Sequence, residues 1–180
     1  LGEKLHQYDL EFLENRKPED IKLILSMIKK GINAPLTSSA GRLFDAVSAL
    51  LNICTDSGFD AEAPMKLESI IDPQIKSYYN CEINGNIISF VPVFRQIIDD
   101  MHQKEDCTVI AAKFHNTVTS VVTDLAKRIR SEKGINKVVL SGGTFQNKYL
   151  SEITVQWLKN MDFEVYQNKW VPSNDGGIAL

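Results

Sequence analysis

The stretch that constrains the fold most runs from Val138 to Asn147, where Val138 and Val139 are followed closely by a Ser-Gly-Gly turn. A helical pattern begins near Gln146, so the predicted order is strand, tight glycine turn and helix N-terminus. Such a turn suits an anion, because glycine lacks the Cβ that would block a phosphate and the helix dipole favours negative charge. A turn of this kind also serves packing alone, and its spacing leaves both interpretations open.

Helices and strands alternate in the C-terminal third of the chain. Apolar spacing predicts a long helix from about Thr108 to Arg130, a strand over Lys137–Leu140, a helix after the glycine turn and a last strand over Phe163–Tyr166. A second turn, Asn174-Asp175-Gly176-Gly177, follows. This order predicts an α/β unit with parallel strands. Both glycine turns then lie at the carboxyl ends of the strands, where ligands gather in open sheets.

Helical periodicity dominates the first 75 residues. A surface helix is predicted from Pro18 to Lys30, and a second helix begins after Pro35 with Ser38 or Ser39 as its cap. The residues predicted to face inward are Ile21, Ile24, Leu25 and Ile28 in the first helix, Leu43, Phe44, Val47, Leu50, Leu51 and Cys54 in the second, and Val118, Val121, Val122, Leu125 and Ile129 in the long C-terminal helix. We therefore expect a helical layer over residues 1–75 and an α/β lobe over residues 76–180.

A β-hairpin is predicted near the start of that lobe. Its strands are Tyr78–Ile83 and Asn86–Phe90, and Asn84-Gly85 is the preferred residue pair for a two-residue type I′ turn. Further helices are predicted within residues 1–15, over Ala61–Ile71, from Pro92 onward and from Gly176-Gly177 onward.

Charge and composition exclude some classes of protein. A net charge of -3 gives no broad cationic surface, so nucleic acid is not expected as a partner. No apolar run approaches the length of a membrane span, so no membrane association is expected. Cys54, Cys81 and Cys107 are far apart, which favours buried reduced thiols in a cytoplasmic protein over a disulfide framework or zinc site. Because the chain opens on Leu1, we expect an excised piece of a longer protein.

Four side chains are candidates for chemistry. Asp175, beside a glycine turn, suits a divalent cation, although Asn174-Asp175-Gly176 also suits an Asx-type turn or cap. Asn147 is placed to hydrogen-bond a ribose or base. His115 is a lone helix histidine, which is more often a packed or capping residue than a catalyst. Asp45 stands in a first helical turn, which the dipole favours without any function. One candidate ligand cannot hold a metal, so the sequence shows no complete active site.

Four motifs in order carry a resemblance to a known family: Thr37–Val47, Phe114–Thr117, Leu140–Asn147 and Asn174–Leu180. Over residues 37–180 the chain resembles the C-terminal part of the HypF-type carbamoyltransferases, which are hydrogenase maturation proteins. The resemblance implies a lobe of the actin-like ATPase (ASKHA) fold, built on an RNase H-like sheet with an added helical N-terminal layer. It also implies a relation to the enzyme that makes threonylcarbamoyladenosine in tRNA.

The activity that the resemblance implies uses carbamoyl phosphate and ATP. A carbamoyl-adenylate forms in a neighbouring domain, and the domain sampled here transfers the carbamoyl group to the C-terminal cysteine of the partner HypE. The resulting thiocarbamate is the precursor of the cyanide ligands on the iron of nickel–iron hydrogenase. The implied cofactors are therefore ATP or carbamoyl-adenylate and a divalent metal.

The resemblance also assigns roles to single residues. It implies that Gly142, Gly143 and Asn147 contact the nucleotide, that Asp175 is a metal ligand, and that Ser38, Ser39, Gly41 and Asp45 lie at the nucleoside side of the cleft. It assigns no role to His115, which belongs to one of the matched motifs.

The match departs from the family pattern in several places. The paired-histidine metal motif, the acylphosphatase-like domain, the zinc-finger region and the adenylate-forming domain are absent from this chain. Ser38 stands where the related tRNA enzyme has an acidic residue, and Asn52 where a glycine is usual. We therefore expect half of a cleft, inactive alone. Two alternatives stay open: a noncatalytic nucleotide-binding or scaffolding lobe of an actin-like protein, and a relative of the tRNA-modifying enzyme.

Overall fold

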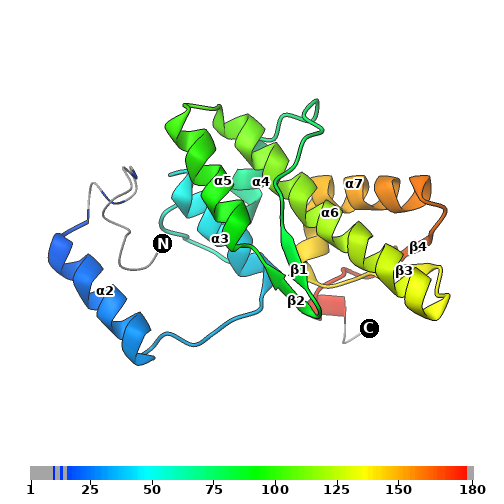
Figure 1. Cartoon of the computed structure of the whole chain (residues 1–180), viewed down its shortest axis with the longest axis horizontal. Helices are drawn as coiled ribbons and strands as arrows, with labels where there is room; N and C mark the ends of the chain where they lie inside the picture. The colour runs from blue at the N-terminus through cyan, green and yellow to red at the C-terminus, as the bar shows by residue number, and fades with distance from the viewer. Residues whose placement is uncertain (1–9, 11–12, 14–15, 178–180) are drawn as a thin grey trace. The chain divides into compact units, whose positions relative to one another are not determined.

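A computed structural model describes residues 10, 13 and 16–177 of the chain. They fall into two compact units, Leu1–Lys66 and Leu67–Leu180, which divide within helix α4 (Glu62–Ser69) (Figure 1). None of the described helices is both long and apolar enough to span a bilayer. Most of the predicted helix within residues 1–15, and the predicted C-terminal helix beyond Gly177, lie outside the described residues.

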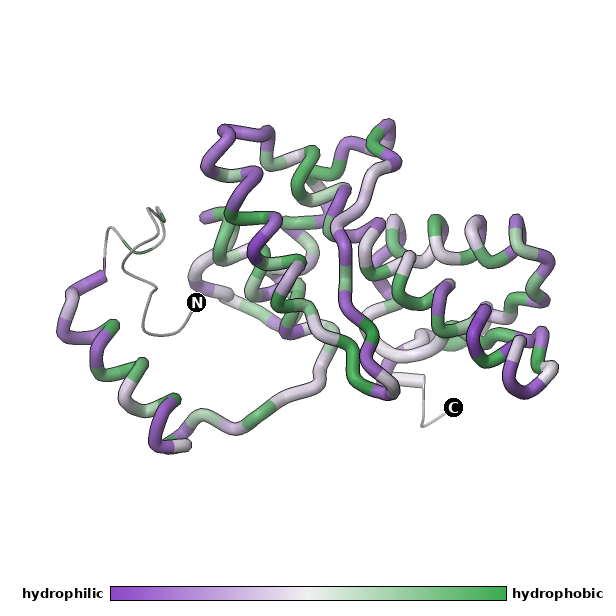
Figure 2. Tube along the Cα trace, in the orientation of Figure 1, coloured by the Kyte–Doolittle hydropathy of each residue, from purple (hydrophilic) through white to green (hydrophobic). Residues whose placement is uncertain are grey.

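Helix α2 (Pro18–Lys30) has the predicted ends but not the predicted buried face. Pro18 stands in its first turn, and Gly31 ends it in the left-handed region with φ +66°. Hydrophobic and hydrophilic residues alternate along it (Figure 2), yet it buries no side chain, and Ile24 and Ile28 are 55% and 59% exposed. The prediction of a buried stripe is therefore wrong here, because helical periodicity identifies an apolar face but not what covers it.

Helix α3 (Ala40–Leu50) has the predicted inward face. Phe44, Val47, Leu50, Leu51 and Cys54 are buried, and each fully buried large apolar side chain stabilises the fold by roughly 1.5–3 kcal/mol. Asn52 follows the helix with φ +55°. This left-handed conformation explains why a glycine suits the position and why asparagine, which tolerates it best among other residues, replaces it.

The predicted hairpin forms with a different turn and shorter strands. Strands β1 (Glu82–Asn84) and β2 (Ile87–Ser89) pair antiparallel, with Asn84 opposite Ile87. The two-residue loop is therefore Gly85-Asn86, in which only Gly85 has positive φ (+60°), so the predicted Asn84-Gly85 type I′ turn is wrong.

The first predicted strand is shortened because helix side chains take the hydrogen bonds of its backbone. The N–H of Tyr79 donates to Thr117 Oγ1 at 2.8 Å. The side-chain amide of Gln96 bonds both the N–H and the C=O of Asn80, at 3.0 and 2.9 Å. An extended segment satisfied in this way needs no neighbouring strand.

Helix α6 (Cys107–Lys133) is the longest element of the second unit and follows α5 (Val91–His102). Asp106 caps it, and Gly134, with φ +68°, ends it. The predicted apolar stripe is only partly buried: Val118 and Val121 are buried, Val122 and Leu125 are half-buried, and Ile129 is 47% exposed. The buried surface instead includes the polar residues His115, Asn116, Thr117, Thr119 and Thr123. Hydropathy does not detect these residues, because hydrogen bonding makes their burial acceptable.

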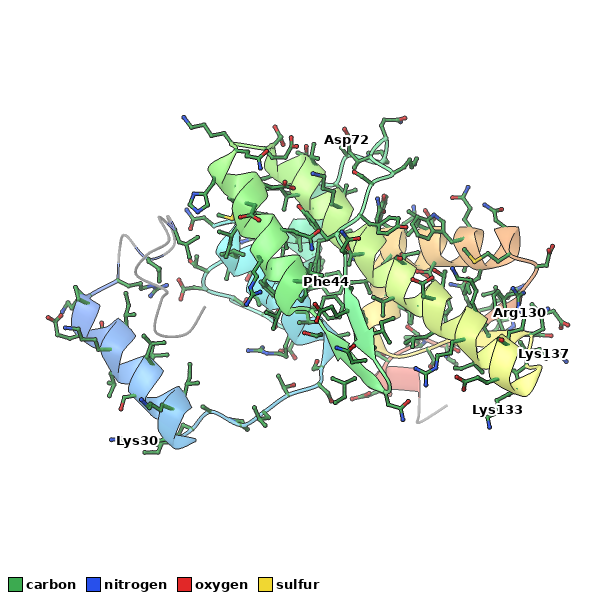
Figure 3. The ribbon with its side chains drawn as sticks, viewed as in Figure 1. Lys30, Phe44, Asp72, Arg130, Lys133 and Lys137 are labelled. Carbon is green, nitrogen blue, oxygen red and sulfur yellow. The ribbon has the colours of Figure 1, made fainter. Side chains whose placement is uncertain are left out.

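The C-terminal part has the predicted α/β order. Strand β3 (Lys137–Leu140) pairs in parallel with β4 (Glu164–Gln167), and helix α7 (Lys148–Asn160) lies between them in sequence. A small core of Ala126, Leu140, Leu158 and Phe163 joins the sheet to α6 and α7. Arg130, at the C-terminal end of α6 (Figure 3), stacks 4.0 Å from the Phe163 ring centroid and donates to the C=O of Met161 at 2.7 Å. The predicted parallel pairing is confirmed.

The three cysteines form no disulfide with one another, and they differ in exposure. Cys54 is buried, Cys81 is half-buried and Cys107 is exposed. The prediction that all three are buried is therefore correct only for Cys54.

Candidate functional site

The two glycine turns meet in the second unit, as predicted. The N–H of Gly142 donates to the C=O of Ser173 at 2.8 Å, and the Ser173 hydroxyl donates to the C=O of Gly142 at 3.1 Å. Gly142 has φ +96° and ψ 158°, a conformation that only glycine adopts without strain. A Cβ added to Gly142 would meet no described atom within 4 Å, so the surface over this turn is open.

Helix α7 does not begin at the glycine turn. A short 3₁₀ helix, η2 (Gly143–Gln146), intervenes, and α7 begins at Lys148 rather than near Gln146. Side chains occupy its N-terminus: Asn147 Oδ1 accepts from the N–H of Leu150 at 2.7 Å, and Glu68 Oε1 accepts from that of Tyr149 at 2.9 Å. The predicted combination of glycine turn and open helix N-terminus is therefore wrong.

The glycine turn itself still offers donors to an anion. Among the described residues, none accepts a hydrogen bond from the backbone N–H groups of Gly143 and Thr144. Successive backbone N–H groups of this kind form a concave binding surface for phosphate oxygens. The turn thus fits an anion through its own amides rather than through the dipole of α7.

Asn174 shapes the second turn. Its Oδ1 accepts from the N–H of Gly176 at 3.2 Å, and its C=O accepts from the N–H of Gly177 at 2.9 Å. A side chain at Gly177 would collide with the carbonyl oxygen of Pro172, so glycine is required there. The Asx-type turn thus belongs to Asn174, and the exposed carboxylate of Asp175 contacts no cation or donor among the described residues.

The described residues do not fit a complete metal site. Among them, no group of three or more His, Cys, Asp or Glu side chains is arranged to hold a metal ion. Asp175 by itself supplies one ligand at most, and a divalent cation takes several oxygen or nitrogen ligands.

His115 is buried between α6 and α7, with no exposed surface. Its Nδ1 lies 2.8 Å from the C=O of Ala111, and its Nε2 lies 3.0 Å from Asn147 Nδ2. Burial lowers its pKa from 6.5 to about 4, so the ring is neutral at pH 7. A neutral ring that donates through Nδ1 must accept through Nε2, so His115 holds the amide of the predicted site residue Asn147.

The remaining predicted site residues lie in the first unit. Ser39 is the N-cap of α3, but its hydroxyl makes no capping hydrogen bond, and Ser38 is also exposed. Gly41 lies in the first turn of α3, but Asp45 lies in the second, so its predicted place in the first turn is wrong. Asp45 forms an ion pair with Arg42 at 2.9 Å.

Two residues of the site were not predicted from the sequence: Ser173, which bonds Gly142, and Glu68, which caps α7. Ser173 directly precedes the second turn, so its place beside Asn174 was a usable signal. Glu68 is 81 residues from the N–H of Tyr149 that it caps, and no spacing pattern indicates such a contact.

Comparisons with known proteins agree with the four sequence motifs. A family model described as "Carbamoyltransferase, Kae1-like Domain, second subdomain" matches residues 3–180. "Carbamoyltransferase HypF" of Synechocystis sp. is 34% identical over 152 residues, which cover 82% of this chain and 19% of that protein. "Probable carbamoyltransferase HypF" of Methanocaldococcus jannaschii is 31% identical over 164 residues, 90% of this chain and 21% of that protein.

Solved structures of HypF proteins are also similar to this chain. A crystal structure of full-length HypF, in its phosphate- and nucleotide-bound form, matches with a TM-score of 0.89 and 43% identity over 94% of this chain and 27% of that one. The HypF structure from T. kodakarensis matches with a TM-score of 0.78 and 25% identity over 88% of this chain and 21% of that one. The likeness confirms the predicted α/β, actin-like fold class. The chain spans about a fifth of the length of the Synechocystis and Methanocaldococcus jannaschii relatives.

Proposed function

This chain belongs to the HypF-type carbamoyltransferase family, and we propose that it forms one wall of the nucleotide-binding cleft of a carbamoyl-transferring enzyme. The proposed enzyme makes carbamoyl-adenylate from carbamoyl phosphate and ATP in the cytoplasm. It passes the carbamoyl group to the C-terminal cysteine of a HypE partner in hydrogenase maturation. We propose that this chain is inactive without the remainder of such an enzyme.

The transfer step defines what this wall has to do. The cysteine sulfur attacks the carbamoyl carbon, a C–S bond forms, and the C–O bond to the adenylate phosphate breaks. AMP leaves with the electron pair of that bond, and the thiol proton passes to a base or to water. Negative charge on the phosphate therefore increases as the bond breaks, and fixed donors aimed at it stabilise the transition state.

The glycine turn carries the proposal. The amides of Gly143 and Thr144 supply two donors, and the open surface at Gly142 admits a phosphate. The hydrogen bonds between Gly142 and Ser173 hold this turn against the second one without occupying those donors. That a related HypF crystallised with phosphate and nucleotide supports the same ligand class for this chain.

Asp175 and the residues of α3 enter as further proposals. Asp175 is proposed as one ligand of a divalent metal, the other ligands being supplied by the rest of the enzyme. Its support is the exposed carboxylate beside the turn at Asn174. The nucleoside contacts are proposed for Ser38, Ser39, Gly41 and Asp45, of which the two serines keep exposed hydroxyls.

A segment exchange tests the function. This 180-residue segment replaces the equivalent one in a full-length HypF-type enzyme, and carbamoylation of the HypE cysteine is measured by mass spectrometry. Transfer is expected, and Gly142→Ala should reduce it about 100-fold, because the φ of +96° excludes a side chain. The control is Gly85→Ala, which also places a side chain at positive φ (+60°), but in the hairpin, and should retain transfer. An inactive exchange enzyme, or equal losses in both variants, contradicts the proposal.

A further inference from the structure

The contact between His115 and Asn147 connects α6 to the glycine turn. Asn147 ends η2, since its N–H donates to the C=O of Thr144 at 3.3 Å, and it caps α7 through the N–H of Leu150. Asn147 is therefore the residue at which the 3₁₀ turn ends, and its side chain caps α7, which begins directly after it. His115 approaches this amide at 3.0 Å from the side of α6.

The hydrogen-bond network allows one assignment of the amide atoms. The C=O of Ala111 only accepts, so Nδ1 of His115 carries the proton and Nε2 is an acceptor. The Asn147 atom facing Nε2 must therefore be the NH₂ group, and Oδ1 faces the N–H of Leu150. A rotated amide would place its oxygen against the lone pair of Nε2 and lose the cap of α7 as well.

This arrangement leaves Asn147 with unused capacity. Its Nδ2 has a second hydrogen, and its Oδ1 has a second lone pair. The amide is thus oriented by protein groups on two sides and retains a donor and an acceptor for a ligand. The ring of Tyr149 meets the ring of His115 edge-on, with centroids 5.8 Å apart, and fixes the plane of the imidazole.

We propose that His115 is a positioning residue for nucleotide binding, which orients the Asn147 amide and thereby fixes the Gly142–Thr144 turn. The identification of the ligand as a nucleotide rests on the proposed function, whereas the effect of His115 on the conformation of the turn does not. His115 forms no hydrogen bond with the N–H groups of Gly143 and Thr144, so it acts on the turn through Asn147. Its neutral, buried state is what the role requires, because an imidazolium would have no acceptor for the amide of Asn147.

Two uncharged substitutions test the hydrogen bonds of Nδ1 and Nε2 separately. In His115→Gln the side-chain oxygen reaches the place of Nε2 and keeps an acceptor for Asn147. In His115→Asn the shorter side chain reaches the place of Nδ1, keeps the donor to Ala111 and loses the acceptor. Ile153→Val, which removes one buried methyl group from α7, controls for loss of packing alone.

The first measurement needs no ligand. In the full 180-residue chain, the ¹⁵N–¹H resonances of Gly142, Gly143 and Thr144 should stay at their wild-type positions in His115→Gln and Ile153→Val. They should shift in His115→Asn. Asn147→Ser, which keeps an oxygen for the cap but is too short to reach His115 Nε2, should shift the same three resonances. This second variant keeps the test decisive should His115→Asn fail to fold.

The second measurement uses the exchange enzyme. His115→Asn should raise the KM for carbamoyl-adenylate in the transfer step about 10-fold and change kcat less than about 3-fold, since a ground-state contact to the nucleotide is misplaced. His115→Gln should restore the KM. Unshifted turn resonances in His115→Asn, or equal defects in the Gln and Asn variants, overturn the inference. An exchange enzyme without transfer activity overturns the proposed function instead, and the resonances still decide the role of His115.

Discussion

Helices α2 and α6 are both amphipathic and both end at a glycine of positive φ, yet α6 is buried along most of its length and α2 buries no side chain. In α6 the buried surface is partly polar, and Thr119, Asn116 and His115 each have partners on other segments. In α2 the apolar residues Ile24 and Ile28 are exposed. The difference shows that amphipathicity alone does not determine whether a helix is buried. Burial also requires side chains on other segments that pack against the helix and form hydrogen bonds with it.

The largest difference in stability is expected between a variant that truncates a buried side chain of α7 and one that truncates an exposed side chain of α2. Leu150 of α7 is fully buried, and Leu150→Ala should lower the free energy of unfolding by about 4 kcal/mol through lost burial and the remaining cavity. Ile24→Ala in α2 should change it by less than about 0.5 kcal/mol. Urea denaturation of the 180-residue chain measures both. Similar losses in the two variants would show that α2 is as tightly packed as the α6–α7 interface.

The sequence was sufficient to predict the elements whose signals are local. Strand β3 has the predicted bounds, and α2 ends where Gly31 indicates. The hairpin turn was displaced by one residue because Gly85 can take either central position of a two-residue turn. Strand Tyr78–Ile83 was shortened because Thr117 and Gln96, from distant helices, bond its backbone.

The candidate site was predictable to the extent that glycine patterns define it. The two turns meet as expected from strand order, since parallel strands bring their carboxyl ends to one edge. The occupied N-terminus of α7 was only partly predictable. Asn147 caps it locally through the N–H of Leu150, whereas Glu68 reaches the N–H of Tyr149 from 81 residues away. The link between His115 and Asn147 also joins residues on separate helices, and neither residue type specifies the other.

Acid should destabilise the α6–α7 region through His115. Burial lowers the pKa of this histidine from 6.5 to about 4, so between these values the unfolded chain binds a proton that the folded chain excludes. Stability is therefore fully present above pH 6.5 and is lost as the pH falls towards 4, by about 3 kcal/mol for a complete shift. Groups that face the ring include the C=O of Ala111, the amide of Asn147 and the rings of Phe114 and Tyr149.

The control for this prediction is His115→Gln, which carries no titratable group. The difference in unfolding free energy between wild type and this variant should shrink or reverse in favour of the variant as pH falls from 7 to 4. Since α2 contains no histidine, hydrogen exchange of its amides should show no opening that depends on residue 115. A pH-independent difference between wild type and variant would contradict the lowered pKa.

A smaller change in stability should distinguish buried hydroxyl groups that have a hydrogen-bond partner from those that have lost it. The hydroxyls of Thr119 in α6 and Thr154 in α7 are 3.1 Å apart, and both residues are fully buried. Thr119→Val should cost about 2 kcal/mol, because it leaves the Thr154 hydroxyl buried without this partner. The double variant Thr119→Val, Thr154→Val should recover most of that loss, since two methyl groups of similar shape then meet. Ser26→Ala in α2 is the control and should change stability by less than about 0.5 kcal/mol.

If the loss of unfolding free energy in the double variant equalled the sum of the losses in the two single variants, the two hydroxyls would be independent. The polar burial of α6 would then not rest on paired groups.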